Sequence, residues 1–147
     1  MQDNVFIDTN IWLYQILQSE DSDHQRKRLT ALEVCQNQDT TIFISTQVLN
    51  EISNVLLKKF FFQREAVLDF LELVLDVAEV IPLDASMTID GVEVACRYRF
   101  SLYDSLIVVA ALNSGCSQLL TEDLQNQQVV RYKNYQTTVI NPFEKHQ

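Results

Sequence analysis

Short apolar runs alternate with amphipathic stretches along the chain. Runs rich in β-branched and aromatic residues, which are typical of buried strands, occur at residues 4–7, 41–44, 79–83, 118–120 and 138–140. Apolar residues recur every three or four positions, as in helices with one buried face, at residues 11–17, 24–36, 48–59, 64–77, 86–98 and 106–112. Strands that alternate with helices predict a parallel sheet with right-handed crossovers. We therefore expect an α/β fold, a three-layer α/β/α sandwich around a mainly parallel sheet of about five strands.

The whole chain is expected to form one domain, residues 1–147. Hydrophobic residues make up 47% of it and charged residues 21%, which is usual for a folded globular protein, and no repeat or break in composition divides it. Cys35, Cys96 and Cys116 are odd in number and show no CxxC spacing. They are therefore expected to be buried thiols in a reducing compartment rather than disulfides or zinc ligands.

Neither a membrane span nor a secretory signal is expected. The most apolar stretch, residues 102–112, contains Asp104 and Ser105 and is too short to cross a bilayer. The first four residues contain no Lys or Arg, which usually open a signal peptide. Together with the cysteine pattern, these features predict a cytoplasmic protein.

The formal net charge is −9, which argues against binding nucleic acid of any sequence through a broad basic surface. It does not exclude a nuclease, because a site for a metal ion is itself acidic and the bound ion attracts phosphate. Charge therefore leaves the class of substrate open.

Four carboxylates each come just after a short apolar run. They are Asp8, Glu51, Asp104 and Asp123. In an open parallel sheet, residues beyond the strand ends share one edge, and that edge is where α/β proteins bind ligands. Carboxylates gathered there repel one another, and their pKa values rise unless a cation lies among them. Oxygen ligands of this kind suit Mg²⁺ or Mn²⁺, so the arrangement indicates a metal-dependent phosphodiesterase.

Each of these acids also has a structural interpretation. Asp8 and Asp104 each precede a predicted helix, where an anion can cap the helix and interact with its dipole. Glu51 can be a solvated residue of its helix. Glu122 lies beside Asp123 and is a second candidate for the same place in the site, although the Thr-x-Asp spacing from Thr121 favours Asp123.

The contexts of the four acids resemble those of PIN-domain ribonucleases, most closely the VapC-type toxins of bacterial toxin–antitoxin pairs. The similarity covers essentially the whole chain in order. It is carried by VFIDTN at 5–10, STQVLNE at 45–51, YDSLIVVAAL at 103–112, LLTEDLQ at 119–125 and NPF at 141–143. One departure is the absence of the Gly that often follows the fourth acid, where this chain reads QNQQ at 125–128.

The resemblance implies a metal-dependent endoribonuclease that uses Mg²⁺ or Mn²⁺ and acts as the toxin of a type II toxin–antitoxin system. Asp8 and Asp104 are expected to bind the metal directly, and Glu51 and Asp123 to hold metal-bound water. The side chains expected to fix the orientation of these carboxylates are Thr9, Asn10 and Thr121, with Glu122 as the alternative fourth acid. RNA is the implied substrate, a cognate antitoxin and a second copy of the chain are the implied protein partners, and no membrane is involved.

Two further features accompany the acids. Arg97 and Arg99 precede Asp104 closely enough to reach a substrate phosphate. Phe60, Phe61 and Phe62 end the helix that carries Glu51, where they either close the core between two helices or expose an apolar surface to a partner.

Two other functions fit part of the pattern. The chain can be a non-catalytic PIN-like interaction module that keeps its acids, although an intact set of four counts against that interpretation. A haloacid-dehalogenase-like phosphatase also begins with an Asp after the first strand, but it needs a second Asp two residues later, where this chain has Asn10.

Overall fold

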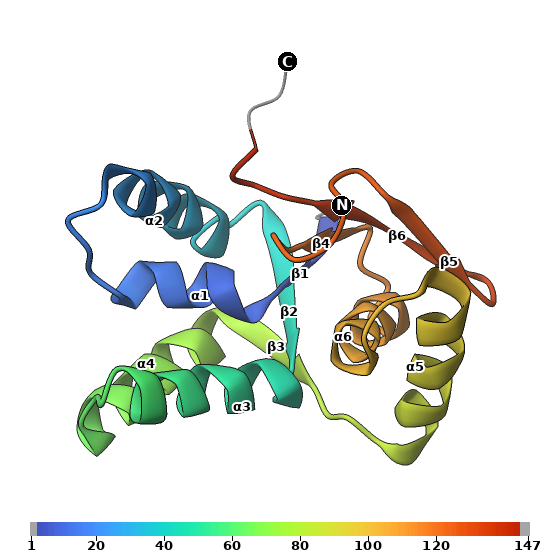
Figure 1. Ribbon diagram of the computed structural model, residues 1–147, viewed down its shortest axis with the longest axis horizontal. Coiled ribbons are helices and arrows are strands. Elements are labelled where there is room, and N and C mark those ends of the chain that lie inside the picture. Colours follow the sequence, from blue (N-terminus) through green and yellow to red (C-terminus); the bar gives the residue numbers. More distant parts are fainter. Residues whose placement is uncertain (1–2, 145–147) are drawn as a thin grey trace.

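The computed structural model describes residues 3–144 and contains one sheet in the order β3-β2-β1-β4-β6-β5 (Figure 1). β1 through β4 and β6 run parallel, and β5 pairs antiparallel with β6. The strands are β1 Asp3–Ile7, β2 Thr40–Ser45, β3 Ala78–Ile81, β4 Gln118–Leu120, β5 Val129–Tyr132 and β6 Tyr135–Ile140. Met1, Gln2 and residues 145–147 lie outside the described part. Two of the four residues on which the expectation about a secretory signal was based therefore lie outside it as well.

Helices cover both faces of the sheet, with α1 to α4 on one side and α5 and α6 on the other (Figure 1). They are α1 Thr9–Ile16, α2 Ser22–Cys35, α3 Thr46–Asn54, the π-helix η1 Val55–Lys59, α4 Arg64–Val77, α5 Ala85–Tyr98 and α6 Leu102–Asn113. The predicted three-layer α/β/α sandwich with a mainly parallel sheet is confirmed. None of the helices within residues 3–144 is both long and apolar enough to cross a membrane.

The sheet has six strands where about five were expected, because the sequence did not predict β5. Its four residues include the exposed Arg131, so the strand lacks a continuous apolar run. β5 and β6 form a hairpin whose turn contains Lys133 with a φ of 54°, a left-handed conformation that turns usually give to Gly or Asn. The turn therefore carries no strong sequence signal.

Two other expectations need correction. The helix predicted over residues 48–59 is α-helical only to Asn54, and its last turn widens into the π-helix η1. Cys35 and Cys116 are buried as expected, but Cys96 is exposed, because it lies on the outer side of α5.

The core is centred on the sheet and on α6, whose residues from Ser105 to Leu112 are all buried. On the other side of the sheet Trp12 of α1 is 1% exposed, and its indole N–H donates to the carbonyl oxygen of Ile7 over 3.0 Å. Ile7 is the last residue of β1, so this bond fixes the turn that contains Asp8. The packing of Trp12 thus holds the beginning of α1 against the end of β1.

We expect Trp12→Phe to destabilise the fold by roughly 2–3 kcal/mol, because it leaves a cavity and removes the bond to Ile7. Urea denaturation followed by circular dichroism measures the change, since the substitution removes the single tryptophan fluorophore. Tyr135→Phe, at a half-exposed ring on β6, serves as the control and is expected to change stability by less than about 0.5 kcal/mol. Equal stability of the Trp12 variant and the wild type would contradict this role of Trp12.

Candidate active site

Asp8 lies at the carboxyl end of β1, next to the end of β4. Its backbone N–H donates to the carbonyl oxygen of Leu120 over 3.0 Å. Its Oδ1 accepts a hydrogen bond from the Thr9 N–H at 2.7 Å, and its Oδ2 accepts one from the Thr121 hydroxyl at 2.8 Å. Asp8 therefore caps α1, as the structural interpretation suggested, and at the same time lies at the junction of two central strands with only 7% of its surface exposed.

Glu51 reaches the same edge from α3. The Thr9 hydroxyl donates to its Oε2 over 2.7 Å, and the Gln47 amide donates to its Oε1 over 2.8 Å. The Gln47 amide also donates to the carbonyl oxygen of Tyr103 at 3.1 Å, in the first turn of α6. This network connects Glu51 with Asp8 through Thr9 and ties α3 to the beginning of α6, so Glu51 is not simply a solvated helix residue.

Asp104 lies in the first turn of α6 and is half-buried. The residue that caps this helix is Ser101, whose hydroxyl accepts the Asp104 N–H over 3.1 Å. The capping role considered for Asp104 is therefore wrong. Its carboxylate makes no hydrogen bond or ion pair within residues 3–144, which leaves it available for a ligand.

Asp123 and Glu122 follow β4 and point to different surroundings. The Asp123 N–H donates to the Thr121 hydroxyl at 3.1 Å, which fixes the turn after β4. Glu122 accepts hydrogen bonds from the Tyr14 hydroxyl at 2.7 Å and from the Lys27 ammonium at 3.0 Å, so its charge is already paired. Of the two acids, Asp123 is the one whose carboxylate is left unpaired among the described residues.

The negative charges of neighbouring acids raise the pKa values of two of the four, Asp8 and Asp123. Burial raises the pKa of Asp8 to about 7, the hydrogen bonds from Thr9 and Thr121 oppose that rise, and the charges of Asp123 and Glu51 add to it. Burial also raises the pKa of Asp123, with further increases from the charges of Asp104, Glu122 and Glu51. Since no Lys or Arg of the described chain offsets these increases, the site lacks positive charge, which a bound cation would supply.

The donor set fits a hard metal ion. All four acids offer only oxygen, which Mg²⁺ and Mn²⁺ prefer. No group of three His, Cys, Asp or Glu side chains within residues 3–144 is already arranged to hold a metal. Mg²⁺ does not need such a cage, because it is usually bound through one or two carboxylates and completes its shell with water and substrate phosphate.

Three other predicted residues lie elsewhere or make other contacts. Asn10 is exposed and makes no hydrogen bond with the carboxylates. Arg97 donates to the carbonyl oxygen of Arg131 over 3.2 Å and lies over the ring of Tyr132, so it is directed toward the β5–β6 hairpin. Arg99 is exposed at the end of α5, in a left-handed conformation with a φ of 61°.

Gln47 is the residue that sequence reasoning missed. It is buried although it is polar, and it holds both Glu51 and the first turn of α6. A signal was present, because Gln47 precedes Glu51 by four residues, and residues at this spacing are neighbours on a helix surface. Only the folded structure shows that α6 supplies the second acceptor.

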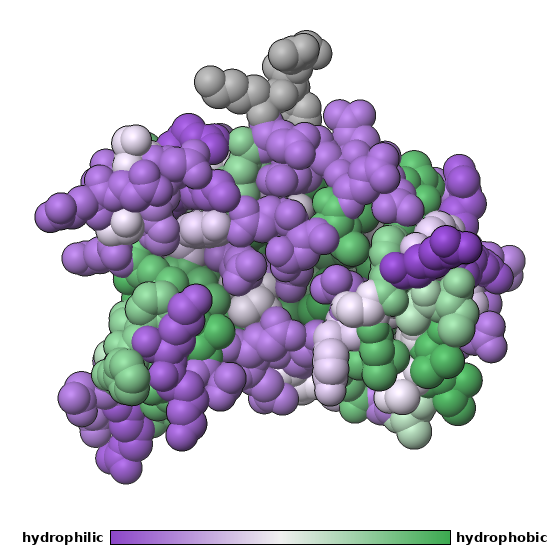
Figure 2. Space-filling model, viewed as in Figure 1, coloured by the Kyte–Doolittle hydropathy of each residue, from purple (hydrophilic) through white to green (hydrophobic). Residues whose placement is uncertain are grey.

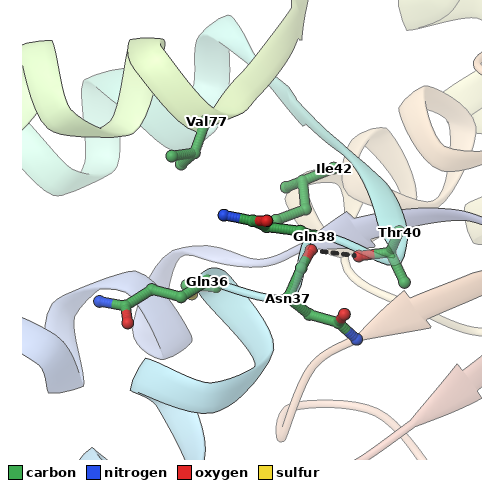
Figure 3. Close-up of a pocket in the computed structure, with 7 residues that line it drawn as sticks. Gln36, Asn37, Gln38, Thr40, Ile42 and Val77 are labelled. Atoms are coloured by element: carbon green, nitrogen blue, oxygen red, sulfur yellow. Dashed lines mark hydrogen bonds between the residues drawn. The ribbon is translucent and has the colours of Figure 1, made fainter.

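The hollows of the surface differ in their relation to the acids. A cavity of about 520 Å³ is lined by Cys35, Gln36, Asn37, Gln38, Thr40, Ile42 and Val77 (Figure 3). It lies where β2 begins, at the opposite edge of the sheet from Asp8, and contains no carboxylate. A hollow of about 340 Å³ includes Glu51, Gln47 and Tyr103 in its lining and so adjoins the acids.

Comparison with known proteins adds an independent finding. The family model of the PIN domain matches residues 5–131, which include all four acids. A comparison with curated protein sequences gives no significant match.

Three solved structures share the fold. VapC20 from Mycobacterium tuberculosis, a sarcin–ricin loop cleaving toxin, is 19% identical, with a TM-score of 0.63 over 81% of this chain and 91% of its own. VapBC2 from Rickettsia felis, bound to a DNA fragment from its promoter, is 22% identical, with a TM-score of 0.57 over 82% of this chain and 88% of the matched one. A toxin–antitoxin complex from Klebsiella pneumoniae is 20% identical, with a TM-score of 0.63 over 96% and 99%.

These structures show that the chain has the fold found in VapC toxins and toxin–antitoxin complexes. The match of the family model extends over most of the sequence and confirms the resemblance that the four acidic segments indicated. The chain belongs to the PIN domain family.

Proposed function

We propose that this chain is a metal-dependent endoribonuclease that hydrolyses phosphodiester bonds of RNA, and that it is the VapC-type toxin of a type II toxin–antitoxin system. The observation that carries the proposal is the group of interacting carboxylates around Asp8, whose pKa is raised to about 7 chiefly by burial and further by the charges of Asp123 and Glu51. Membership of the PIN domain family and the RNA-cleaving toxin among the structural neighbours support it.

Each acid has a distinct part in this proposal. Asp8 and Asp104 would hold Mg²⁺ or Mn²⁺, and Glu51 and Asp123 would orient a water molecule beside them. When bound, the metal lowers the pKa of water and neutralises charge that develops on the phosphate. Thr9 and Thr121 contribute by fixing carboxylate orientation, since their hydroxyls donate to Glu51 at 2.7 Å and to Asp8 at 2.8 Å.

Asp8→Asn and Asp104→Asn are each expected to reduce RNA cleavage to background, because each removes a ligand charge, and EDTA is expected to do the same to the wild type. The assay follows cleavage of a labelled single-stranded RNA with millimolar Mg²⁺ or Mn²⁺. Asp76→Asn, an exposed acid on α4, is the matched control and should cleave like the wild type. Full activity in EDTA or in either site variant would leave a non-catalytic PIN-like interaction module as the better explanation.

Without metal, Asp8 is expected to reduce stability as pH rises. Its pKa is 3.8 when unperturbed and about 7 in the folded protein, so the folded state binds the proton more tightly. The free energy of unfolding therefore falls between about pH 4 and pH 7. Asp8→Asn should abolish that slope and be more stable than the wild type at pH 8 by roughly 2–4 kcal/mol.

Urea denaturation in EDTA from pH 4 to pH 8 measures this effect as the difference between the two proteins. Mg²⁺ or Mn²⁺ should raise the melting temperature of the wild type more at pH 8 than at pH 5, because the ion binds ionised carboxylates. If the free energy of unfolding of the two proteins changed with pH in the same way, burial would not disfavour the ionised form of Asp8.

An antitoxin and a second copy of the chain complete the proposal, as does a cytoplasmic location. Phe61 is 80% exposed at the end of η1 with a φ of 54°, and Phe60 is 42% exposed, whereas Phe62 packs against the core. Leu68 and Leu75 add exposed apolar surface on α4. Figure 2 shows hydrophobic side chains at the surface on the left, where α3 and α4 lie, and at the lower right, over α5.

An amphipathic helix of the antitoxin would cover the surface near η1 and α4 through anchors at i, i+3 and i+4. Two of the structural neighbours are themselves complexes of toxin and antitoxin. A basic side chain of such a helix could pair with the acidic cluster and displace the metal, so that inhibition would combine charge with steric block.

Phe61→Glu is expected to weaken the complex with the antitoxin by at least about tenfold and to leave RNA cleavage within about twofold, because it charges an apolar contact away from the acids. Where a small reading frame adjoins the gene, its product is the candidate antitoxin with which binding is measured. Tyr135→Glu, an exposed aromatic on β6, is the control and should bind normally. Unchanged affinity of the Phe61 variant would remove η1 from the interface, and a strictly monomeric protein that never slows growth would contradict the toxin role.

A further inference from the structure

The hollow of about 340 Å³ beside the acids has walls from three parts of the chain. Glu51 and Gln47 on α3 belong both to its lining and to the candidate active site, and Tyr103 on α6 also lines it. Leu83 and Leu106 supply apolar surface, so the hollow is not simply an extension of the acidic cluster. Glu51 is the lining residue that the hollow shares with the acids, and Asn50 and Asn54 continue the lining on α3.

The walls are held in place by contacts independent of any ligand. The Gln47 amide bridges Glu51 and the Tyr103 carbonyl oxygen, which fixes the distance between α3 and α6. The Leu83 N–H donates to the Thr46 hydroxyl over 3.2 Å. Leu106 packs so closely on α5 that a Cβ at Gly91 would lie 2.8 Å from its Cδ2 atom. The hollow is therefore preformed, as ligand sites usually are.

The chemistry of the lining selects for a flat, neutral, polar-edged group. The Tyr103 side chain is 68% exposed although it is aromatic, and it immediately precedes Asp104. Asn50 and Asn54 lie one helical turn apart on α3, both exposed, and each offers an amide donor and acceptor. Glu51 is the single charged residue of the lining, so a phosphate would be repelled, whereas a nucleobase carries no charge.

We propose that this hollow binds a nucleobase of the RNA next to the bond that is cut. Tyr103 stacks on the base, and Asn50 and Asn54 read its hydrogen-bonding edge, so the three residues determine which base is accepted. This inference rests on the proposed ribonuclease function and adds to it a source of sequence preference. Stacking on an aromatic side chain tolerates every base, and the discrimination therefore lies with the two amides.

Cleavage of a random-sequence single-stranded RNA, with the new ends sequenced, tests the proposal. The wild type should prefer particular bases at one position beside the cut. Tyr103→Ala should lower kcat/KM by on the order of tenfold to a hundredfold, whereas Tyr103→Phe retains the ring and should stay within a few fold. Asn54→Asp, which replaces the amide donor with an acceptor, should change the preferred base at that same position. Tyr135→Ala is the control for loss of an exposed Tyr.

A second measurement separates this inference from the proposed function. Asp8→Asn protein is titrated with single-stranded RNA containing 2-aminopurine, whose fluorescence responds to stacking. If the fluorescence response of the Asp8→Asn protein is lost in the double variant that also carries Tyr103→Ala, the hollow is supported as a base site, even if the wild type cleaves no RNA. An active enzyme whose base preference and kcat/KM are unchanged by Tyr103→Ala overturns it. The proposal is also overturned if Tyr103→Ala alters only the oligomeric state measured by light scattering, because a second copy would then occupy the hollow.

Discussion

The burial of one carboxylate, Asp8, is the constraint on which the site depends. The fold brings the ends of β1 and β4 together around it, with the Asp8 N–H bonded to the Leu120 carbonyl oxygen and its Oδ2 to the Thr121 hydroxyl. Two hydrogen bonds from Thr9 and Thr121 stabilise the ionised form, but burial has the larger effect, and the pKa of Asp8 rises to about 7. The protein thus keeps an acid at a position where burial disfavours its ionised form.

Hydrogen-bond donors hold two of the acids in place. Asp8 and Glu51 each accept hydrogen bonds from their own set of neighbours. Thr9 contacts both Asp8, through its N–H, and Glu51, through its hydroxyl, so one residue sets the relative positions of two carboxylates. Gln47 does the same for Glu51 and the first turn of α6. Asp104 and Asp123 have no such donor for their carboxylates within residues 3–144, which leaves these two acids for a cation or for water.

The sequence predicts the layers, the parallel sheet and the carboxylate edge because these follow from buried strands, and a buried strand is a local apolar run. It does not predict β5, whose Arg131 interrupts the pattern, or the π-helical turn, in which the Phe60 N–H donates to the carbonyl oxygen of Val55 over 3.2 Å. The choice between Glu122 and Asp123 also needed the fold, because Lys27 and Tyr14 come from distant segments. Likewise, Arg97 and Arg99 are close to Asp104 in sequence, but α5 directs Arg97 to the hairpin.

In the proposed function, a chain with a net charge of −9 brings a polyanion to the edge that carries the four acids, where no Lys or Arg of the described chain offsets the raised pKa values of Asp8 and Asp123. Lys27, the basic residue joined to the segment after β4, is paired with Glu122. In that proposal, the attraction of RNA would come from a metal ion bound at the acids and from contacts to neutral parts of the nucleotide. Stacking and amide contacts meet no electrostatic penalty beside Glu51, whereas a phosphate there would. This asymmetry favours recognition through the base on the α3–α6 side and recognition of the phosphate only at the metal.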